Sequence, residues 1–394
     1  MILSKRFFHK FIAPIRGAAA WPRGPLARRV KRATQRYDSD KRYRILFTQP
    51  HVNLHLLFQL SDCESQRDLA QELEEDQNLQ EAVGCSSVNH SSLSRANAGR
   101  TFRVFRYIFH ALYPKAISCA GPVLKSLEGL KQVKILDESF LQCCASMAWA
   151  QYRKTKNGLK LRPEGLSSEG LHLLLDLRRI PDKLVLTPGR ENERGVLKQI
   201  FRRGVTYIID RGYNSYDLFI RMTRSGAFFV TRLLANAVFE IIEPLPLSLE
   251  NIDRGVIGDC LIYLGGPNTR CPFKLRLITY WAEDGKVYRY LTNRLDLDPW
   301  IVCEMYHWRW EIELFFRFIK QYLKVKRFLG RNENAVLIQL YAAMITFMLL
   351  QIYAKVAENL DRVTKRVLRR VRRRLFNWVS DDEIAAYLAA IGSG

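Results

Sequence analysis

The first third of the chain carries apolar residues at helical spacing, separated by polar turns. Val52, Leu56, Leu57 and Leu60 fall on one helical face, and Ser65 can cap a second helix over residues 66–79. A third helix is predicted from residue 91, followed by arginines at 100, 103 and 106. Short helices with an arginine-rich last member are typical of small DNA-binding domains, although an ordinary helical bundle has the same pattern. We therefore expect residues 38–130 to form a helical domain that binds DNA.

From residue 131 the pattern changes to short apolar runs of the strand type. These runs cover residues 133–137, 171–177, 183–186, 205–210 and 227–231, and residues 143–152 can form a hairpin partner of the first run. A helix is predicted over residues 191–203, and another between the last two strands. Strands that alternate with helices indicate an α/β sheet rather than a sandwich. We expect residues 131–232 to form the first part of this α/β core.

Residues 233–292 have the pattern of a β-rich insertion. Prolines and glycines interrupt the segment, and apolar runs lie between them at 260–264, 273–281 and 287–291. Asp284 and Gly285 are a typical pair for a hairpin turn. After Pro299 one long amphipathic helix is expected to continue to about residue 325, so that residues 293–330 return the chain to the core.

Residues 335–354 contain no charged side chain and are long enough to cross a membrane. However, Gln339, Thr346 and Gln351 interrupt the run, and it is the only such segment in the sequence. We therefore expect a buried core helix within a C-terminal helical region, residues 331–394, and no membrane association. The N-terminus lacks a continuous apolar core of signal-peptide length, so no secretion signal is predicted.

The charge of the chain indicates a polyanionic partner. Among 394 residues, 62 Lys and Arg against 39 Asp and Glu give a net charge of +23. An enzyme of small metabolites has no need of this self-repulsion, whereas DNA or RNA compensates it; a basic ribosome-associated protein also fits. Residues 1–37 alone carry ten Lys and Arg, no acid and three prolines that interrupt any helix. This segment is predicted to be either a flexible basic arm that contacts phosphates or an extension outside the folded protein.

The eight cysteines are scattered along the chain, and none forms a Cys-x-x-Cys pair. This spacing argues against a zinc ribbon and against a secreted disulfide scaffold, and it indicates the reducing cytoplasm of a cell. Because the sequence also lacks a cluster of His and Cys, we expect any metal ion to be held by carboxylates.

Two acidic residues stand where strands end. Asp137 and Asp210 each follow a short apolar run, and ligands gather at the carboxyl edge of an open α/β sheet. Taken alone, an Asp in this position is more often a turn former or a helix cap. Asp176, Asp217 and Glu311 are rival carboxylates in the same part of the chain.

A third acidic residue lies on the long helix of residues 300–325. At about 100° per residue, one arc of roughly 60° holds four polar residues: Tyr306, Arg309, Glu313 and Lys320. Apolar residues occupy the neighbouring arc, so one face packs into the protein while its edge presents a carboxylate among two cations and a phenol. A solvated face with salt bridges has the same spacing.

The spacing Tyr306-x2-Arg309-x3-Glu313-x6-Lys320 resembles the Tyr-Arg-Glu-Lys signature of the DDE transposases of bacterial insertion sequences. Three surrounding stretches are similar to the family as well: Tyr290-Leu-Thr-Asn293, Arg309-Trp-Glu-Ile-Glu313-Leu-Phe-Phe-Arg317 and Asp210-Arg-Gly-Tyr213-Asn-Ser215. Upstream, Ile135-Leu-Asp137-Glu-Ser139 looks like the segment that carries the family's first Asp. The resemblance covers about residues 36–375.

The resemblance implies an RNase H-like catalytic core that is interrupted by the β-rich insertion. It implies that Asp137, Asp210 and Glu313 are the catalytic residues and bind two Mg²⁺ ions, which Mn²⁺ can replace. Two metal ions held by carboxylates activate the attacking oxygen and stabilise the leaving oxygen of a phosphodiester. The resemblance further implies that Tyr306, Arg309 and Lys320 contact double-stranded DNA near the reacting phosphate. A homodimer is implied because two ends of a mobile element must be held together.

Three functions are compatible with these features. A transposase would bind terminal inverted repeats, cleave DNA at the ends of the element and join the 3′ ends to target DNA. An RNase H-fold nuclease would only hydrolyse, and it does not require the basic helical segment, Tyr306 or Lys320. A binding-only relic or inhibitor of transposition does not require all three carboxylates, which are present here. The sequence therefore favours the transposase.

Overall fold

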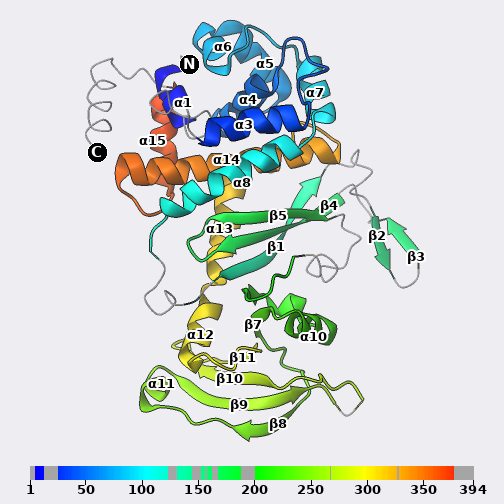
Figure 1. The fold of residues 1–394 in the computed structure, drawn as a ribbon, viewed down its shortest axis with the longest axis vertical. Coiled ribbons are helices and arrows are strands. Elements are labelled where there is room, and N and C mark those ends of the chain that lie inside the picture. The colour runs from blue at the N-terminus through cyan, green and yellow to red at the C-terminus, as the bar shows by residue number, and fades with distance from the viewer. Residues whose placement is uncertain are drawn as a thin grey trace.

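One mixed β-sheet runs through the computed structural model, and a layer of helices lies against one end of it (Figure 1). The structure describes residues 5–12, 25–122, 130, 132–143, 152–155, 158–161, 167–187, 200–266, 268–325 and 328–376. The predicted α/β class is confirmed in this coarse form, because strands and helices alternate from residue 200 to residue 232.

The nine strands of the sheet follow the order β5-β4-β1-β6-β7-β11-β10-β9-β8. Its first half consists of β1 (Val133–Cys143), β4 (Ser167–Asp176), β5 (Pro181–Thr187), β6 (Thr206–Ile209) and β7 (Phe228–Arg232). Strands β1, β6 and β7 are parallel neighbours, whereas β4 and β5 continue the sheet in antiparallel fashion. A separate hairpin joins β2 (Tyr152–Thr155) to β3 (Gly158–Leu161).

The second half of the sheet is made by the segment that was predicted to be β-rich. It contains β8 (Phe239–Pro244), α11 (Leu249–Asp253), β9 (Val256–Leu264), β10 (Leu275–Trp281) and β11 (Val287–Thr292). Strand β11 pairs with β7, so these strands extend the same sheet. The predicted hairpin between β10 and β11 is confirmed, and Gly285 adopts the left-handed φ of 75° that its turn requires.

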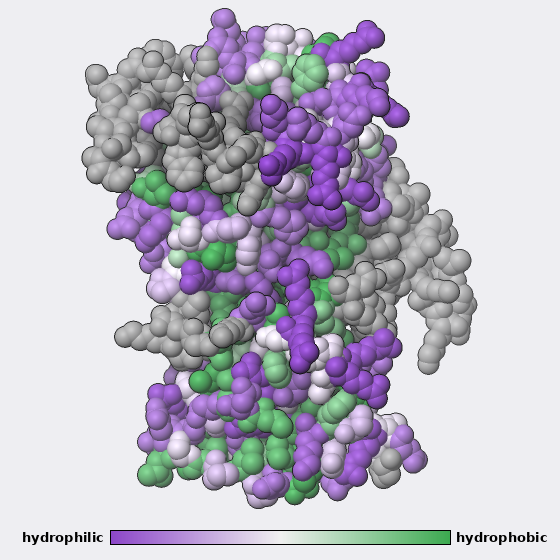
Figure 2. All heavy atoms as spheres, viewed as in Figure 1, coloured by the Kyte–Doolittle hydropathy of each residue, from purple (hydrophilic) through white to green (hydrophobic). Residues whose placement is uncertain are grey.

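Exposed apolar side chains gather at the β8–β11 end of the molecule. The face shown in Figure 2 has green patches at its lower end, where Figure 1 places these strands. The exposed residues there include Val238, Ile241, Leu249, Ile257 and Trp281. The rest of that face is predominantly hydrophilic, as the net charge of the chain leads one to expect.

The helical layer is organised around α14 (Glu333–Glu358), which packs against α4 (Thr48–Leu60), α7 (His90–Gly99) and α8 (Arg103–Ser118). An 18-residue window of α14 is apolar enough to cross a membrane, and all of it is buried inside the protein. A helix that is apolar on every side belongs in a protein core, because no side of it can face water at low cost. The prediction of a buried core helix is confirmed.

The helix predicted over residues 66–79 differs from the structure in its bounds. Ser65 does cap a helix, through a capping box with Asp68, but residues 66–79 form two helices, α5 (Gln66–Glu75) and α6 (Gln77–Val83). Asp76 ends the first helix and accepts a hydrogen bond from the Leu79 amide as the cap of the second. Because the apolar positions keep helical spacing across this break, the sequence pattern does not reveal it.

The first core strand is longer than predicted, and its partners are different. Strand β1 continues to Cys143, so Cys143 does not begin a hairpin partner of β1, and residues 144–151 lie outside the described part of the chain. The antiparallel partner in the structure is β4, where Asp137 stands opposite Leu173. The helix predicted over residues 191–203 falls mostly outside the described residues, and residues 200–203 are not helical.

The N-terminal segment contains helices that the sequence did not predict. Helix α1 (Lys5–Phe11) buries Phe7, Phe8 and Phe11 in the main core, and α3 (Pro25–Arg36) packs against α8. The expectation that prolines prevent helices here is therefore wrong for these two stretches. Pro25 is the first residue of α3, a position where the amide hydrogen that proline lacks is not needed.

The long helix predicted after Pro299 is also divided, into α12 (Pro299–His307) and α13 (Trp310–Tyr322). At the junction the Arg309 amide bonds to the Tyr306 carbonyl at 3.0 Å, and the Glu311 amide bonds to the Trp308 carbonyl at 3.0 Å. These bonds span three residues rather than the four of an α-helix, which tightens the chain and changes its direction. Tyr306 therefore lies on α12 and Arg309 caps the start of α13, whereas Glu313 and Lys320 lie on α13 itself.

Candidate active site

Asp137 and Asp210 lie next to each other because β1 and β6 are parallel neighbours in register. Leu136 is the register partner of Ile209. Asp137 is the next residue of β1, and Asp210 directly follows the last residue of β6. Asp210 also caps the short helix η3 (Arg211–Tyr213), where its Oδ2 accepts a hydrogen bond from the Gly212 amide at 3.2 Å. Asp210 is therefore both a helix cap, as an isolated Asp in this position suggests, and a residue of the candidate site.

Arg309 brings the third carboxylate to the same place. Its Nη2 lies 2.6 Å from Glu313 Oε1, its Nη1 lies 3.8 Å from Asp137 Oδ2, and its Nε lies 3.8 Å from Asp210 Oδ1. One guanidinium therefore contacts all three acidic residues that the sequence singled out, although they are 73 and 103 positions apart in the chain. The two Asp come from the sheet and Glu313 comes from the first turn of α13.

The site is half-buried, and three acids surround the Arg309 guanidinium. The side chain of Arg309 is 18% exposed, whereas those of Asp210 and Glu313 are 35% and 33% exposed. Burial lowers the pKa of Arg309, but the hydrogen bond to Glu313 and the charges of its neighbours outweigh this and raise the pKa. Among the residues that the structure describes, none accepts a hydrogen bond from the buried Nε, so one donor of the guanidinium is left unsatisfied there.

The donor set of this cluster fits a hard divalent cation. Mg²⁺ prefers carboxylate oxygens together with water, and the three side chains supply only carboxylate oxygens to one point. Within the described residues, no group of three or more His, Cys, Asp or Glu is already arranged to hold a metal ion. The reason is visible in the contacts, because the guanidinium lies between the carboxylates as their common counter-ion. A metal ion in this place requires Arg309 to move.

Tyr306 stands beside the cluster on α12. Its ring centroid is 4.9 Å from that of Tyr290 on β11, and the Arg309 guanidinium carbon lies 5.9 Å from the Tyr306 ring. Burial raises the pKa of Tyr306 to about 12; the Arg309 charge opposes this shift, and the Asp210 charge adds to it. The phenol is therefore protonated at neutral pH and can donate a hydrogen bond.

Lys320 lies two helical turns beyond Glu313 on α13 and is half-buried. Seven residues of α-helix correspond to about 10 Å along the axis. Lys320 therefore lies on the same helix as Glu313, two turns closer to its C-terminal end.

The rival carboxylates are engaged elsewhere. Asp176 forms an ion pair with Lys134 at 3.1 Å, and Asp217 pairs with Arg221 within α10 (Tyr216–Arg224) at 2.8 Å. Glu311 accepts two hydrogen bonds from Arg179, at 2.6 and 3.0 Å. These geometries leave Asp137, Asp210 and Glu313 as the acidic group that converges.

Sequence reasoning missed Arg179, which positions the start of α13. Besides its bidentate bond to Glu311, its guanidinium carbon lies 5.1 Å from the Trp308 ring. Arg179 has a positive φ of 63°, which is unusual for a residue with a side chain. No motif marks it, because it acts through a contact 132 positions along the chain.

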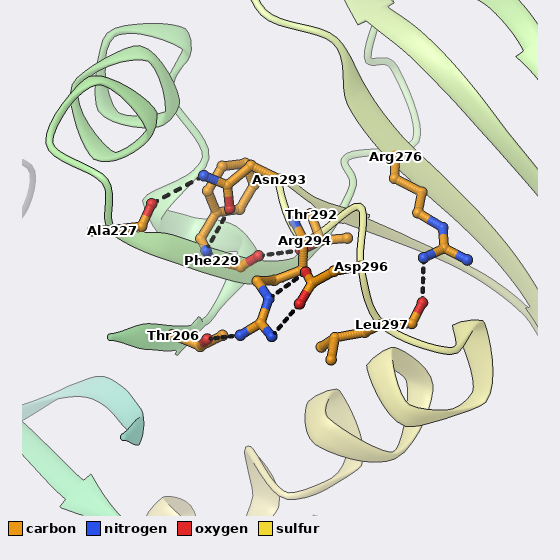
Figure 3. A network of polar contacts seen from close by, with 9 residues as sticks. All are labelled: Thr206, Ala227, Phe229, Arg276, Thr292, Asn293, Arg294, Asp296 and Leu297. Atoms are coloured by element: carbon orange, nitrogen blue, oxygen red, sulfur yellow. Dashed lines mark hydrogen bonds and ion pairs between the residues drawn. The ribbon is translucent and has the colours of Figure 1, made fainter. Parts of the chain in front are cut away.

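The Tyr290-Leu-Thr-Asn293 stretch has a structural role near the site. Asn293 accepts a hydrogen bond from the Phe229 amide at 2.9 Å and donates one to the Ala227 carbonyl at 3.0 Å (Figure 3). The next residue, Arg294, donates to Thr206 Oγ1 at 2.8 Å and pairs with Asp296. Together these bonds tie the end of β11 to β7 and β6, and β6 carries Asp210 at its end.

Comparison with known proteins gives matches over most of this region. The family model described as "Transposase DDE domain" matches residues 128–349. A Sinorhizobium fredii protein named as transposase y4zB is 31% identical over 283 residues, which cover 70% of this chain and 74% of that protein. A Synechocystis protein named as a transposase for the insertion sequence element IS4SA is 41% identical over 281 residues, 68% of this chain and 72% of the relative.

A third relative is a Geobacillus stearothermophilus protein named as a transposase for the insertion sequence element IS5377. It is 25% identical over 270 residues, which cover 68% of each chain. Among solved structures, a piggyBac transposase synaptic complex with hairpin DNA matches 99% of this chain and 86% of its own, with 10% identity and a TM-score of 0.44. That likeness is too low to identify the fold.

Proposed function

Because this chain belongs to the DDE transposase family, we propose that it binds the terminal inverted repeats of an insertion sequence, cleaves the DNA at the ends of the element and joins the 3′ ends to target DNA. The observation that carries the proposal is the convergence of Asp137, Asp210 and Glu313 on the guanidinium of Arg309. Proteins of this family use divalent metal ions, and the three carboxylates are the residues that would hold Mg²⁺ or Mn²⁺.

Bound metal supplies an activated oxygen nucleophile and stabilisation of the leaving oxygen. Around it, the side chains of this chain bind and orient the DNA backbone. Arg309, once separated from the carboxylates, can hold a phosphate through two parallel hydrogen bonds. Tyr306 can donate a hydrogen bond from its neutral phenol, and Lys320 can neutralise a neighbouring phosphate. The joining step requires a DNA end that is held close to a second phosphodiester. Such positioning makes the reaction effectively unimolecular, because the two reacting groups no longer have to meet by diffusion.

The partners of this reaction are double-stranded DNA and a second copy of the chain. The net charge of +23 suits a polyanion, and residues 38–130 are the proposed helical DNA-binding domain. The RNase H-like core is proposed for residues 131–232 and 293–330, interrupted by the insertion of residues 233–292. A homodimer follows from the need to hold two ends of one element, and the proposed location is the bacterial cytoplasm.

The proposal is tested with a DNA substrate that contains the inverted repeats flanking the gene. Purified protein is incubated with Mg²⁺, and nicked, double-strand-cut and joined products are followed separately. We expect Glu313→Gln to abolish all three products. Asp217→Asn is the matched control, because it removes an exposed carboxylate that pairs with Arg221 and lies outside the cluster. It should leave the products unchanged.

The other two functions predict different products. Cutting without joined product would identify a nuclease, and specific binding of the ends without cutting would identify a binding-only protein. Wild-type activity in the Glu313→Gln variant would refute the assignment of the cluster itself.

A further inference from the structure

Helix α15 (Lys365–Phe376) combines an apolar face with an unusually basic one. Its sequence Lys-Arg-Val-Leu-Arg-Arg-Val-Arg-Arg-Arg-Leu-Phe contains seven cations and no acid. Val367, Leu368, Val371 and Leu375 are buried, and the helix lies against α1 and α14 (Figure 1). The apolar face therefore accounts for the attachment of this helix to the protein, whereas the basic face needs a separate explanation.

Part of the charge on α15 is used within the fold. Glu358 pairs with both Arg370 and Arg374, and Arg372 donates a hydrogen bond to the Tyr322 carbonyl at 3.1 Å. Arg374 also donates to the hydroxyl of Tyr353. These three arginines fasten α15 to α14 and to the end of α13.

The remaining arginines form an outward row. Arg366, Arg369 and Arg373 are exposed, and no residue in the described part of the chain forms an ion pair with them. Their spacing of three and four residues places them on one side of the helix, over about 10 Å. Like charges at this spacing destabilise a helix, so the row does not serve the stability of α15.

A cleft lies between the segment that leads into α15 and the residues next to the start of α13. Its volume is about 370 Å³, and its walls include Arg178, Arg179 and Trp308 on one side and Arg362 and Thr364 on the other. Trp308 directly precedes Arg309, and Thr364 directly precedes α15. Arg362 is exposed, and the one acid of the cleft, Asp361, pairs with Lys355 at 2.8 Å. The charge of the cleft is therefore predominantly positive.

We propose that this cleft and the row Arg366, Arg369 and Arg373 form a second DNA-binding surface, which holds the phosphate backbone of the duplex that leads away from the cluster of Asp137, Asp210 and Glu313. The inference rests on the proposed function and extends it to a surface that the signature residues do not include. Guanidinium groups bind phosphates through paired hydrogen bonds, and phosphates follow at about 3.4 Å per strand along the duplex axis. A row of about 10 Å can thus contact three successive phosphates.

The contact of α15 with the end of α13, the helix that carries Glu313, favours duplex DNA over an acidic protein as the partner. Tyr322, which accepts from Arg372, is nine residues beyond Glu313 on α13, about 14 Å along the helix. That distance corresponds to about four base pairs. DNA whose reacting phosphate lies at Glu313 therefore reaches α15 after about four base pairs and follows it for about three more.

The test compares two triple variants of the full chain. R366Q/R369Q/R373Q removes the row, and K274Q/K286Q/R289Q removes three exposed cations near the β10–β11 hairpin, at the opposite end of the molecule in Figure 1. Binding to a 30-base-pair duplex is measured by fluorescence anisotropy at several salt concentrations. Loss of three phosphate contacts should lower the slope of log affinity against log salt by about 2.7 for the α15 variant. The control should keep the wild-type slope.

A second measurement locates the contact. The duplex beyond the cleavage point is shortened stepwise from 12 to 2 base pairs, with a constant element end. Wild-type affinity should fall between about eight and four base pairs, since these positions reach α15. The α15 variant should start from the lower affinity and show no further fall over this range.

Several results would overturn the proposal. An equal slope in the α15 variant and wild type, or an equal decrease in both triple variants, would show that the row makes no specific contact with DNA. Retained DNA binding together with lost binding of a poly-glutamate peptide or of anionic vesicles would assign the row to another partner. Failure of the proposed function is distinguishable, because it appears as missing cut or joined products of the wild-type protein and not as a changed salt dependence of the α15 variant.

Discussion

Arg309 Nη2 lies 2.6 Å from Glu313 Oε1, one turn away on α13, while the same guanidinium reaches Asp137 and Asp210 on the sheet. The contact links the helix to Asp137 within β1, which continues beyond the predicted strand end, and to Asp210 at the end of β6. It also makes the candidate metal site an ion-pair cluster, in which Arg309 contacts three acids. The exchange of this cation for metal is therefore central to the behaviour of the site.

Replacement of Arg309 by Gln should make the protein less stable without metal and more responsive to it. Three carboxylates that lose their common cation repel one another, and loss of the charged hydrogen bond costs about 1–2 kcal/mol of unfolding free energy. A divalent ion no longer has to displace the guanidinium, so it should bind more tightly. Thermal unfolding with and without Ca²⁺ measures both effects.

Arg317→Gln is the control for this experiment, because Arg317 is exposed on the same helix. It should show the wild-type melting temperature and the wild-type response to Ca²⁺. An Arg309→Gln protein with an unaltered response to Ca²⁺ would contradict the exchange of guanidinium for metal.

Asp210→Asn should abolish strand cleavage while it leaves binding to the element ends intact. The change removes the negative charge of one carboxylate from the cluster but no contact with phosphate. Because negative charge near DNA is lost, binding should tighten slightly. Gel-shift titration and cleavage of the same labelled end measure the two properties. Cleavage at the wild-type rate, or a tenfold loss of affinity, would be inconsistent with the assigned role.

Lys320→Ala should reduce joining and second-strand cleavage more than the first nick. A first nick needs mainly the metal site and a water molecule, whereas later steps need a DNA end that is held and aimed at a second phosphodiester. A time course that separates nicked, cut and joined DNA makes the comparison. An equal loss at every stage would place Lys320 in general DNA binding instead.

The pair formed by Arg179 and Glu311 should be strongly coupled. Both hydrogen bonds are short, at 2.6 and 3.0 Å, and both side chains are less than one third exposed. A double-mutant cycle with Arg179→Met and Glu311→Gln, measured by urea unfolding, should give a coupling free energy of about 1–3 kcal/mol. Additive effects of the two substitutions would show that Arg179 does not hold the start of α13.

Phe8→Ala should destabilise the folded protein, although the residue lies in the basic N-terminal segment. The Phe8 side chain is fully buried, and removal of such a ring costs about 3–5 kcal/mol. Phe47→Ala is a suitable control, since Phe47 is 46% exposed. Equal unfolding free energies for wild type and Phe8→Ala would indicate that α1 does not belong to the cooperative fold.

Local features of the sequence were sufficient for most elements. The strand that leads to Asp210, the hairpin at Gly285, the Ser65 cap and the buried α14 all depend on residues near one another in the chain. Hydrophobic periodicity and turn chemistry act over a few residues, so they can be recognised without the fold. The same periodicity is insensitive to one tight turn, which is why the breaks at Asp76 and at Trp308 were not predicted.

The residues of the candidate site could be predicted from the sequence for a different reason. Asp137 and Asp210 were identified by the apolar runs that precede them, Glu313 by its position on an amphipathic helix, and all three by resemblance to a family signature. None was identified by a proximity that the sequence expresses. Their meeting depends on the parallel register of β1 with β6 and on the packing of α13 against β1. Such relationships arise from contacts between residues far apart in the chain, and no local pattern records them.

The sequence by itself determined the chemical types available to the site: three carboxylates, two cations and a phenol. Only the tertiary structure decided that Arg309 lies among the carboxylates, that Tyr306 approaches from a separate helix, and that Arg179 supports α13. A side chain's charge is a property of its residue, whereas the partner that balances the charge depends on which surfaces pack together. The arginine row of α15 follows the same logic, because identical residues on that helix are bound by Glu358, Tyr322 and Tyr353 or left exposed according to the side of the helix on which they lie.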